Sequence, residues 1–217
     1  ADGIENGKAY VFDILTGNLV STLTNPLAEI GGNGDQFGKV VSISGNYAIV
    51  GSRLEDADGE NSGKAYIFDV TTGTLVSTLT NPSPDGTNYL VGSKVGIDGN
   101  YAIVGGYYED TGGSLIDIAY VFDVTTGNLV STLTNPLFGG GNGTDNFGVS
   151  SVSISGNYAI VGAQLEDIDG ENNGKAYIFD VTTGNLVSTL TNPLAGNGTT
   201  DYFGISVSID GNYAIVG

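Results

Sequence analysis

Apolar and polar residues alternate in short segments along this chain, and the stretch from 149 to 191 shows the pattern once in full. Residues 149–155 place valine and isoleucine between serines, as in a strand with one buried face. A Ser-Gly-Asn turn leads into 158–161, an apolar run typical of a strand buried on both faces. Two further segments, 176–180 and 186–191, are joined by a Thr-Gly-Asn loop. The pattern predicts four antiparallel strands and no helix.

This unit recurs along the whole sequence. The phrase Asn-Tyr-Ala-Ile-Val-Gly returns every 54 to 57 residues, starting at Asn46, Asn100, Asn157 and Asn212. A second phrase, Ala-Tyr-(Val/Ile)-Phe-Asp, keeps the same spacing from Ala9, Ala65, Ala119 and Ala176. Four short antiparallel strands in about 55 residues match one blade of a β-propeller. We therefore predict an all-β propeller built from four blade-equivalents.

The phrases also divide the chain into blades. We expect one repeat domain over 1–217, with a half-blade at each end and three complete blades between them, at 1–25, 37–81, 90–135, 147–192 and 203–217. The first half-blade carries the last two strands of a unit, and the second carries the first two. Closure of one chain into a four-bladed ring is the first expectation. An eight-bladed ring shared by two chains and a head-to-tail filament are the alternatives.

The residues that open the units support a family resemblance. Phe-Gly stands at the start of three units, at Phe37, Phe147 and Phe203. A strand, a turn and Ala-Ile-Val-Gly follow, and Ala-Tyr-(Val/Ile)-Phe-Asp comes later in the unit. This two-part pattern resembles the FG-GAP repeats of integrin α-subunit propellers and their bacterial relatives, which implies a propeller fold. A weaker likeness links the Asp-Val-Thr-Thr-Gly segment at 123–127 to quinoprotein propeller blades.

Composition narrows the range of functions. Twenty-four acidic residues against six basic ones give a formal charge of −18, which disfavours nucleic acid as a partner. No apolar run approaches the roughly 20 residues of a membrane-spanning helix. The chain has no cysteine and no histidine, so thiolate catalysis and the commonest general base are excluded. These features favour an extracellular or cell-surface protein of bacterial type that is not an enzyme.

Acidic loops are the candidate metal sites. Two nearly identical loops supply oxygen ligands of the kind that Ca²⁺ needs. The candidate ligands are Asp56, Asp58, Glu60, Asn61, Asp167, Asp169, Glu171 and Asn172. In the resembling family the calcium loop lies between the first two strands of a blade, where this chain has only short Gly-Asn turns, so those sites do not carry over. Two interpretations stay open: a relocated calcium site, and a solvated acidic hairpin loop.

Other repeated side chains have structural explanations. An aspartate recurs at one blade position, where we expect it to accept hydrogen bonds from the Thr-Gly turn, at Asp13, Asp69, Asp123 and Asp180. Tyrosines recur as well, and packing between blades is the first explanation, with a repeated sugar pocket as the alternative. One segment departs from the repeat and replaces the acidic loop with adjacent aromatic residues. It is the candidate contact site, formed by Tyr107, Tyr108, Glu109 and Asp110.

These observations lead to one functional prediction and two alternatives. We expect a non-enzymatic extracellular or cell-surface scaffold or adhesion module, stabilised by Ca²⁺ and self-assembling through its half-blades. Its partner is a protein or a glycan at the surface. The first alternative is a multivalent, lectin-like propeller that binds carbohydrate. An enzyme is the least favoured class, because no acidic pair lies outside the repeat.

Overall fold

The computed structural model describes residues 7–27, 34–56, 62–82, 91–109, 115–137, 145–166, 173–194 and 201–217. Every regular element among them is a β-strand, and none of them belongs to a helix that could cross a bilayer. The strands are β1 (Lys8–Phe12), β2 (Leu19–Thr24), β3 (Val40–Ser44), β4 (Tyr47–Ser52), β5 (Lys64–Asp69), β6 (Leu75–Thr80), β7 (Lys94–Asp98), β8 (Tyr101–Glu109), β9 (Leu115–Asp123), β10 (Leu129–Thr134), β11 (Val152–Ser155), β12 (Tyr158–Ala163), β13 (Lys175–Asp180), β14 (Leu186–Thr191), β15 (Val207–Asp210) and β16 (Tyr213–Val216).

The strands form five antiparallel sheets in chain order. Three sheets have four strands each, β3–β6, β7–β10 and β11–β14. Two sheets have only two strands, β1–β2 and β15–β16. Within each sheet, every strand pairs with the next strand along the chain. This arrangement confirms the all-β prediction and the division into three complete blades and two half-blades.

Local sequence explains the strands of each sheet. In β11, Val152 and Ile154 are buried while the serines between them are not, as the alternation predicts. Residues 159–163 of β12 are all buried, in agreement with a strand covered on both faces. The turn between β11 and β12 holds Gly156 at φ 55°, a left-handed conformation that glycine adopts without strain.

Neighbouring sheets share their cores. Ile103 and Val121 of the sheet β7–β10 belong to one buried cluster with Val152 and Ala159 of the sheet β11–β14. Another cluster joins Ile49 of β4 to strands of the sheet β7–β10 in the same way. Each sheet therefore buries its apolar faces mainly against the sheets beside it. In such arrays stability comes largely from nearest-neighbour interfaces.

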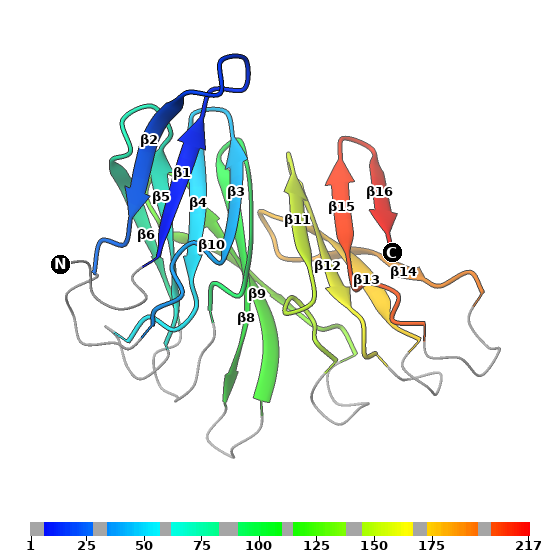
Figure 1. Ribbon diagram of the computed structural model, residues 1–217. Coiled ribbons are helices and arrows are strands. Elements are labelled where there is room, and N and C mark those ends of the chain that lie inside the picture. Colours follow the sequence, from blue (N-terminus) through cyan, green and yellow to red (C-terminus); the bar gives the residue numbers. More distant parts are fainter. Residues whose placement is uncertain are drawn as a thin grey trace.

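The sheets form an open arc. Their first strands β3, β7, β11 and β15 lie next to one another in that order. Figure 1 shows β1–β2 at one end of the arc and β15–β16 at the other. Among the described residues, β1 pairs only with β2 and β16 pairs only with β15. The expected four-bladed ring within one chain is therefore absent from this structure, because four blade-equivalents turn too little to bring the two half-sheets together.

Candidate functional site

The repeated aspartates each hold one turn between the third and fourth strands. The Asp69 Oδ1 atom accepts hydrogen bonds from the backbone N of Thr71 and Thr72, both at 2.9 Å, and from both threonine hydroxyls. The same pattern occurs at Asp123 and Asp180. Asp13 accepts the same two backbone bonds but only one hydroxyl bond, because Leu15 stands in place of the first threonine. Hydrogen bonds from Thr71 and Thr72 lower the pKa of Asp69 to about 2. The predicted structural role of this aspartate is confirmed.

The tyrosines of the third strands pack inside the molecule. Tyr66, Tyr120 and Tyr177 are buried, whereas Tyr10 at the open end is exposed. The Tyr66 ring lies 6.0 Å from the ring of Phe37, and the Tyr177 ring lies 5.9 Å from that of Phe147. The buried rings serve packing, as the first explanation predicted, and cannot stack on a sugar.

The candidate calcium ligands fall almost entirely outside the described residues. Asp56 is described, whereas Asp58, Glu60, Asn61, Asp167, Asp169, Glu171 and Asn172 are not. Within the described ranges no three acidic side chains converge on a point that could hold a metal ion. The calcium site therefore stays a prediction.

A buried polar network joins the first half-sheet to the next sheet. The Asn25 Nδ2 atom donates hydrogen bonds to the Asp35 Oδ2 atom at 2.8 Å and to the Glu55 Oε2 atom at 3.3 Å. The Tyr66 hydroxyl also lies 3.2 Å from that Glu55 oxygen. Burial, followed by the charges of Glu55 and Asp56, raises the pKa of Asp35 to about 6. The network ties residues that lie about 30 positions apart into one junction.

The same network recurs at the junction between β7–β10 and β11–β14. Asn135 donates to Asp145 at 2.9 Å and to Glu166 at 3.0 Å, and the Tyr177 hydroxyl lies 3.3 Å from Glu166. Burial and the charges of Glu166 and Asp145 raise the pKa of Tyr177. Sequence reasoning missed this network. The sequence nevertheless contains a signal for this network. In these units an Asn-Pro pair follows the fourth strand, and an aspartate stands two residues before Phe-Gly.

The hairpin of β8 and β9 departs from the repeat. In the first complete sheet, the pairing of β4 with β5 ends at Ser52 and Lys64. The pairing of β8 with β9 continues for three more pairs, Tyr107↔Asp117, Tyr108↔Ile116 and Glu109↔Leu115. Figure 1 shows that this hairpin extends beyond the neighbouring strands. The candidate contact residues therefore start on an extended hairpin, although Asp110 lies outside the described residues.

Side chains near the base of this hairpin are held firmly. Tyr107 and Tyr108 are half-buried, and Tyr108 packs against an apolar cluster that includes Ile118. Asp117 accepts a hydrogen bond from the backbone N of Phe147 at 3.2 Å. Burial, with a smaller contribution from the charge of Asp145, raises the pKa of Asp117 to about 7. Sequence reasoning also missed Asp117, whose signal is Asp-Ile in place of the Gly-Lys of other units.

Comparison with known proteins agrees with this architecture. The FG-GAP repeat model matches residues 27–68 and 139–179. No curated protein matches this chain. Among solved structures, the computationally designed Ika8 protein shares 18% identity at a TM-score of 0.55, over 98% of this chain and 50% of that one.

Two enzymes have a similar fold. Quinohemoprotein alcohol dehydrogenase from Comamonas testosteroni shares 14% identity at a TM-score of 0.54, over 88% of this chain and 33% of that one. A europium-containing methanol dehydrogenase shares 12% identity at a TM-score of 0.51, over 85% of this chain and 38% of that one. This chain thus spans half or less of the length of these three proteins. At such identities the likeness concerns the fold alone. Together with the sheet order, it shows a β-propeller-like fold in which FG-GAP repeats are detected at residues 27–68 and 139–179.

Proposed function

We propose that this chain is a non-enzymatic scaffold or adhesion module that acts outside the cell or on a bacterial surface. The repeated polar groups support this proposal, because they hold turns and blade junctions together. Asp69 and its copies accept hydrogen bonds from threonines within their own turns. Glu55 and Glu166 are buried in the junction networks. Polar groups that are hydrogen-bonded or buried in this way stabilise a rigid framework, and such a framework presents a surface to a partner.

The β8–β9 hairpin is the observation that carries the proposal. It alone among the described hairpins lengthens its strands, to nine residues each. Tyr107 and Tyr108 stand where the first complete sheet has Arg53 and Leu54 and where the third has Gln164 and Leu165. Aromatic side chains with one exposed face supply contact area at a low cost in conformational entropy. We assign the hairpin as the surface that contacts a protein partner.

The test replaces the two tyrosines of the hairpin with the residues that another blade carries at the same positions. Tyr107→Gln with Tyr108→Leu gives the middle blade the side chains of the third blade. Beads coated with the 217-residue chain are compared for adhesion to surfaces coated with extracellular matrix protein or mucin. We expect the double variant to keep its melting temperature and lose at least about tenfold in adhesion, since aromatic anchors dominate such contacts. Arg53→Gln, the matched change in the first blade, leaves adhesion unchanged.

Two binding results would contradict this proposal. One is adhesion that survives the double substitution while the folded state is intact. The other is binding on a glycan array that is equally strong for the wild type and the double variant, which would favour the lectin-like alternative. A turnover activity abolished by a single substitution in the hairpin would favour an enzyme.

Calcium stabilisation is part of the proposal and is tested separately. The carboxylates of the acidic loops and Asp56 are the proposed ligands. Binding at 100 times Kd adds about 2.7 kcal/mol to the free energy of unfolding. We expect 5 mM CaCl₂ to raise the melting temperature relative to EDTA, and Asp56→Asn with Asp58→Asn to reduce that rise. An unchanged melting temperature would contradict stabilisation by calcium.

A further inference from the structure

The polar junction between β1–β2 and β3–β6 holds two buried carboxylate oxygens that accept no hydrogen bond. They are the Asp35 Oδ1 atom and the Glu55 Oε1 atom. Asp35 is 3% exposed and Glu55 is completely buried, so bulk water does not solvate either carboxylate. A buried acceptor without a donor is costly, most of all when it carries a charge. In native proteins such an atom calls for a bound ion, an ordered water or a proton.

One amide group brings the two carboxylates together. The Asn25 Nδ2 atom lies 2.8 Å from the Asp35 Oδ2 atom and 3.3 Å from the Glu55 Oε2 atom. The Asn25 Oδ1 atom accepts a hydrogen bond from the backbone N of Leu27 at 3.0 Å, which fixes the orientation of the amide. An amide nitrogen has two N–H donors, and one oxygen of each carboxylate uses them. The second oxygen of each carboxylate is therefore the one without a donor.

Hydrogen bonds fix the backbone around both acids. The Asp35 carbonyl accepts hydrogen bonds from the backbone N of Leu54 at 3.2 Å and from the Ser52 hydroxyl at 3.0 Å. The Glu55 carbonyl accepts a hydrogen bond from the Ser62 hydroxyl at 3.0 Å. A binding site needs ligands that are held in place before the ion arrives. These two carboxylates meet that requirement.

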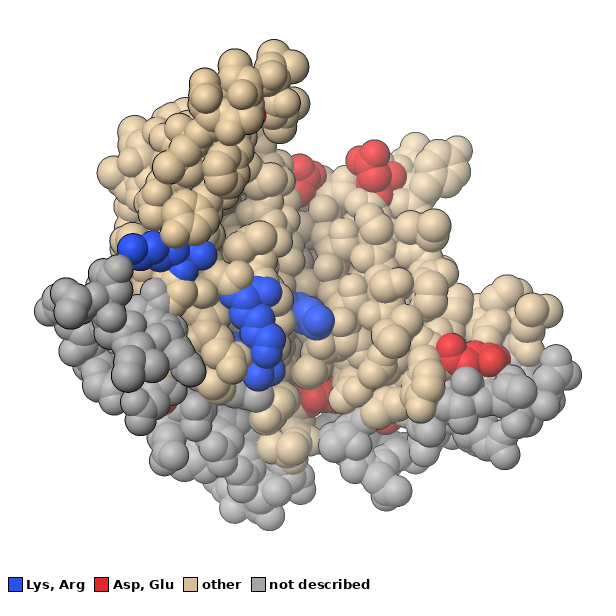
Figure 2. Space-filling model, in the orientation of Figure 1, with Lys and Arg blue, Asp and Glu red and all other residues tan. Residues whose placement is uncertain are grey.

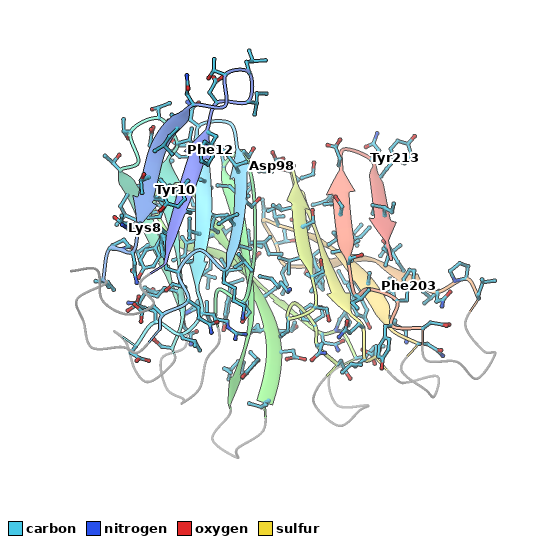
Figure 3. The ribbon with its side chains drawn as sticks, in the orientation of Figure 1. Lys8, Tyr10, Phe12, Asp98, Phe203 and Tyr213 are labelled. Carbon is cyan, nitrogen blue, oxygen red and sulfur yellow. The ribbon has the colours of Figure 1, made fainter. Side chains whose placement is uncertain are left out.

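The segment that carries Asp35 also lies against the first half-sheet. A Cβ atom at Gly7 would collide with the Phe37 carbonyl, and one at Gly38 would come within 3.0 Å of the Lys8 carbonyl oxygen. Lys8, labelled in Figure 3, is the first residue of β1. Only glycine permits two backbones to approach this closely. The carboxylates therefore belong to a tight contact between two sheets.

Basic side chains near the junction do not donate to the two oxygens. Figure 2 shows Lys and Arg side chains gathered over the part of the surface formed by β1 and the strands beside it. Lys39 and Arg53 both donate to the side-chain oxygen of Gln36. Within the described part of the chain, no group donates to the Oδ1 atom of Asp35 or the Oε1 atom of Glu55. A positive partner for these oxygens has to come from outside the described residues.

The junction between β7–β10 and β11–β14 has the same polar residues without this feature. Asn135 donates to Asp145 at 2.9 Å and to Glu166 at 3.0 Å, in the pattern of the first junction. Asp145 is only half-buried, and Ala163 stands there in place of Ser52. Among the described atoms, neither acid of this junction has a buried oxygen that lacks a partner. The unpartnered oxygens are therefore a property of the first junction and not of the repeat.

We propose that Asp35 and Glu55 bind a divalent metal cation at the first junction. Two ionised carboxylates carry two negative charges, and one divalent ion neutralises both. A water molecule would donate to the oxygens but leave both charges in place, and a single proton would remove only one of them. Buried charges in proteins are paired or bind metals, and hard cations such as Ca²⁺ prefer carboxylate oxygens. This site is separate from the calcium loop of the proposed function, because it uses neither Asp56 nor residues 58–61.

Equilibrium dialysis with radioactive Ca²⁺ tests the site on the 217-residue chain. Calcium is the probe because it accepts irregular sets of oxygen ligands better than Mg²⁺. Burial raises the pKa of Asp35 to about 6, so the measurement is made at pH 8, in about 150 mM KCl to screen weak binding to exposed carboxylates. We expect Asp35→Asn and Glu55→Gln each to raise the dissociation constant of one tight site at least about tenfold. Asp145→Asn, the matched change at the other junction, leaves it unchanged.

The melting temperature separates a metal ligand from a merely structural carboxylate. In EDTA, Asp35→Asn is expected to melt no lower than the wild type, because it removes one of two like charges and adds an N–H donor near Glu55. With 5 mM CaCl₂, the melting temperature of the wild type is expected to rise more than that of the variant. Equal destabilisation of Asp35→Asn with and without calcium would show a structural role alone and overturn the proposal.

Three results of the dialysis experiment would also overturn the proposal. The first is equal calcium affinity of the wild type and Asp35→Asn. The second is the absence of a tight site in the wild type, which would assign the two oxygens to water or a proton. The third is a tight site that is lost in Asp56→Asn with Asp58→Asn but kept in Asp35→Asn. That result would place the ion in the acidic loop and would support the calcium part of the proposed function instead.

Discussion

Residues of the same kinds occur at the junction between β7–β10 and β11–β14 and at the two open ends of the arc. They are buried at the junction and exposed at the ends. At the junction, Phe147 and Val181 are buried and the Ser131 hydroxyl meets the Val181 carbonyl. In the first half-sheet, Ile14 and Phe12 face solvent, whereas their counterparts Val181 and Phe179 are buried. The residue type is nearly constant along the repeat, so the neighbouring sheet decides what is buried. A blade in this chain depends on contacts that lie outside its own sequence.

The largest expected effect comes from the aromatic side chain at the interior junction. Phe147→Ala is expected to lower the free energy of unfolding by about 3–5 kcal/mol, because Phe147 is fully buried against Tyr177 and Phe179. The matched change at the open end, Phe203→Ala, is expected to cost about 1–2 kcal/mol, since Phe203 is only partly buried. Urea unfolding measures both values. Losses of equal size in these two variants would contradict the distinction between junction and end.

A smaller effect is expected from the half-buried carboxyl group of Asp117 at the same junction. The pKa of Asp117 is raised from 3.8 to about 7, so protonation accompanies folding. The stability linked to that proton is complete below about pH 4 and is lost as the pH rises through 7. Asp117→Asn keeps an oxygen for the Phe147 backbone N and needs no proton. We expect it to stabilise the chain by about 2 kcal/mol at pH 8 and by little at pH 4.

Thermal unfolding at pH 4, 6 and 8 measures this dependence. Asp201→Asn is the control, because Asp201 is exposed near the open end. Its effect is expected to be small at all three pH values. A stabilisation by Asp117→Asn that does not change with pH would show that the carboxyl group is ionised throughout the range.

The smallest effect is expected from one hydroxyl group at the junction. Ser131→Ala removes the hydrogen bond to the Val181 carbonyl, which leaves that buried acceptor without its partner. The expected loss is about 1 kcal/mol. Ser188→Ala, the matched change in β14, is expected to leave the stability of the 217-residue chain unchanged. Equal losses of stability in the two variants would contradict the distinction between junction and end.

Much of the fold could be predicted from the sequence because period-two alternation and the recurring phrases report local strand structure directly. The pairing of β11 to β14 follows the predicted segments, and the Thr-Gly turn with its aspartate behaves as expected. The open arc could not be predicted. It depends on the angle between neighbouring sheets, which no local pattern records.

The buried network was harder to predict for a different reason. Asn25, Asp35 and Glu55 come from three separate segments, and each looks like part of a polar loop. Their burial depends on how two sheets pack, so single-sequence patterns assign them to solvent. The contact hairpin was easier, because Tyr107 and Tyr108 interrupt a repeat that is otherwise regular. Departure from a repeat is a signal that sequence reasoning can use.

The paired unfolding of Phe147→Ala and Phe203→Ala tests the central claim most directly, because the two phenylalanines hold the same position in the repeat. Phe147 is fully buried and Phe203 is only partly buried, so the account predicts a loss of about 3–5 kcal/mol in the first variant and about 1–2 kcal/mol in the second. Equal losses in urea unfolding would contradict the account.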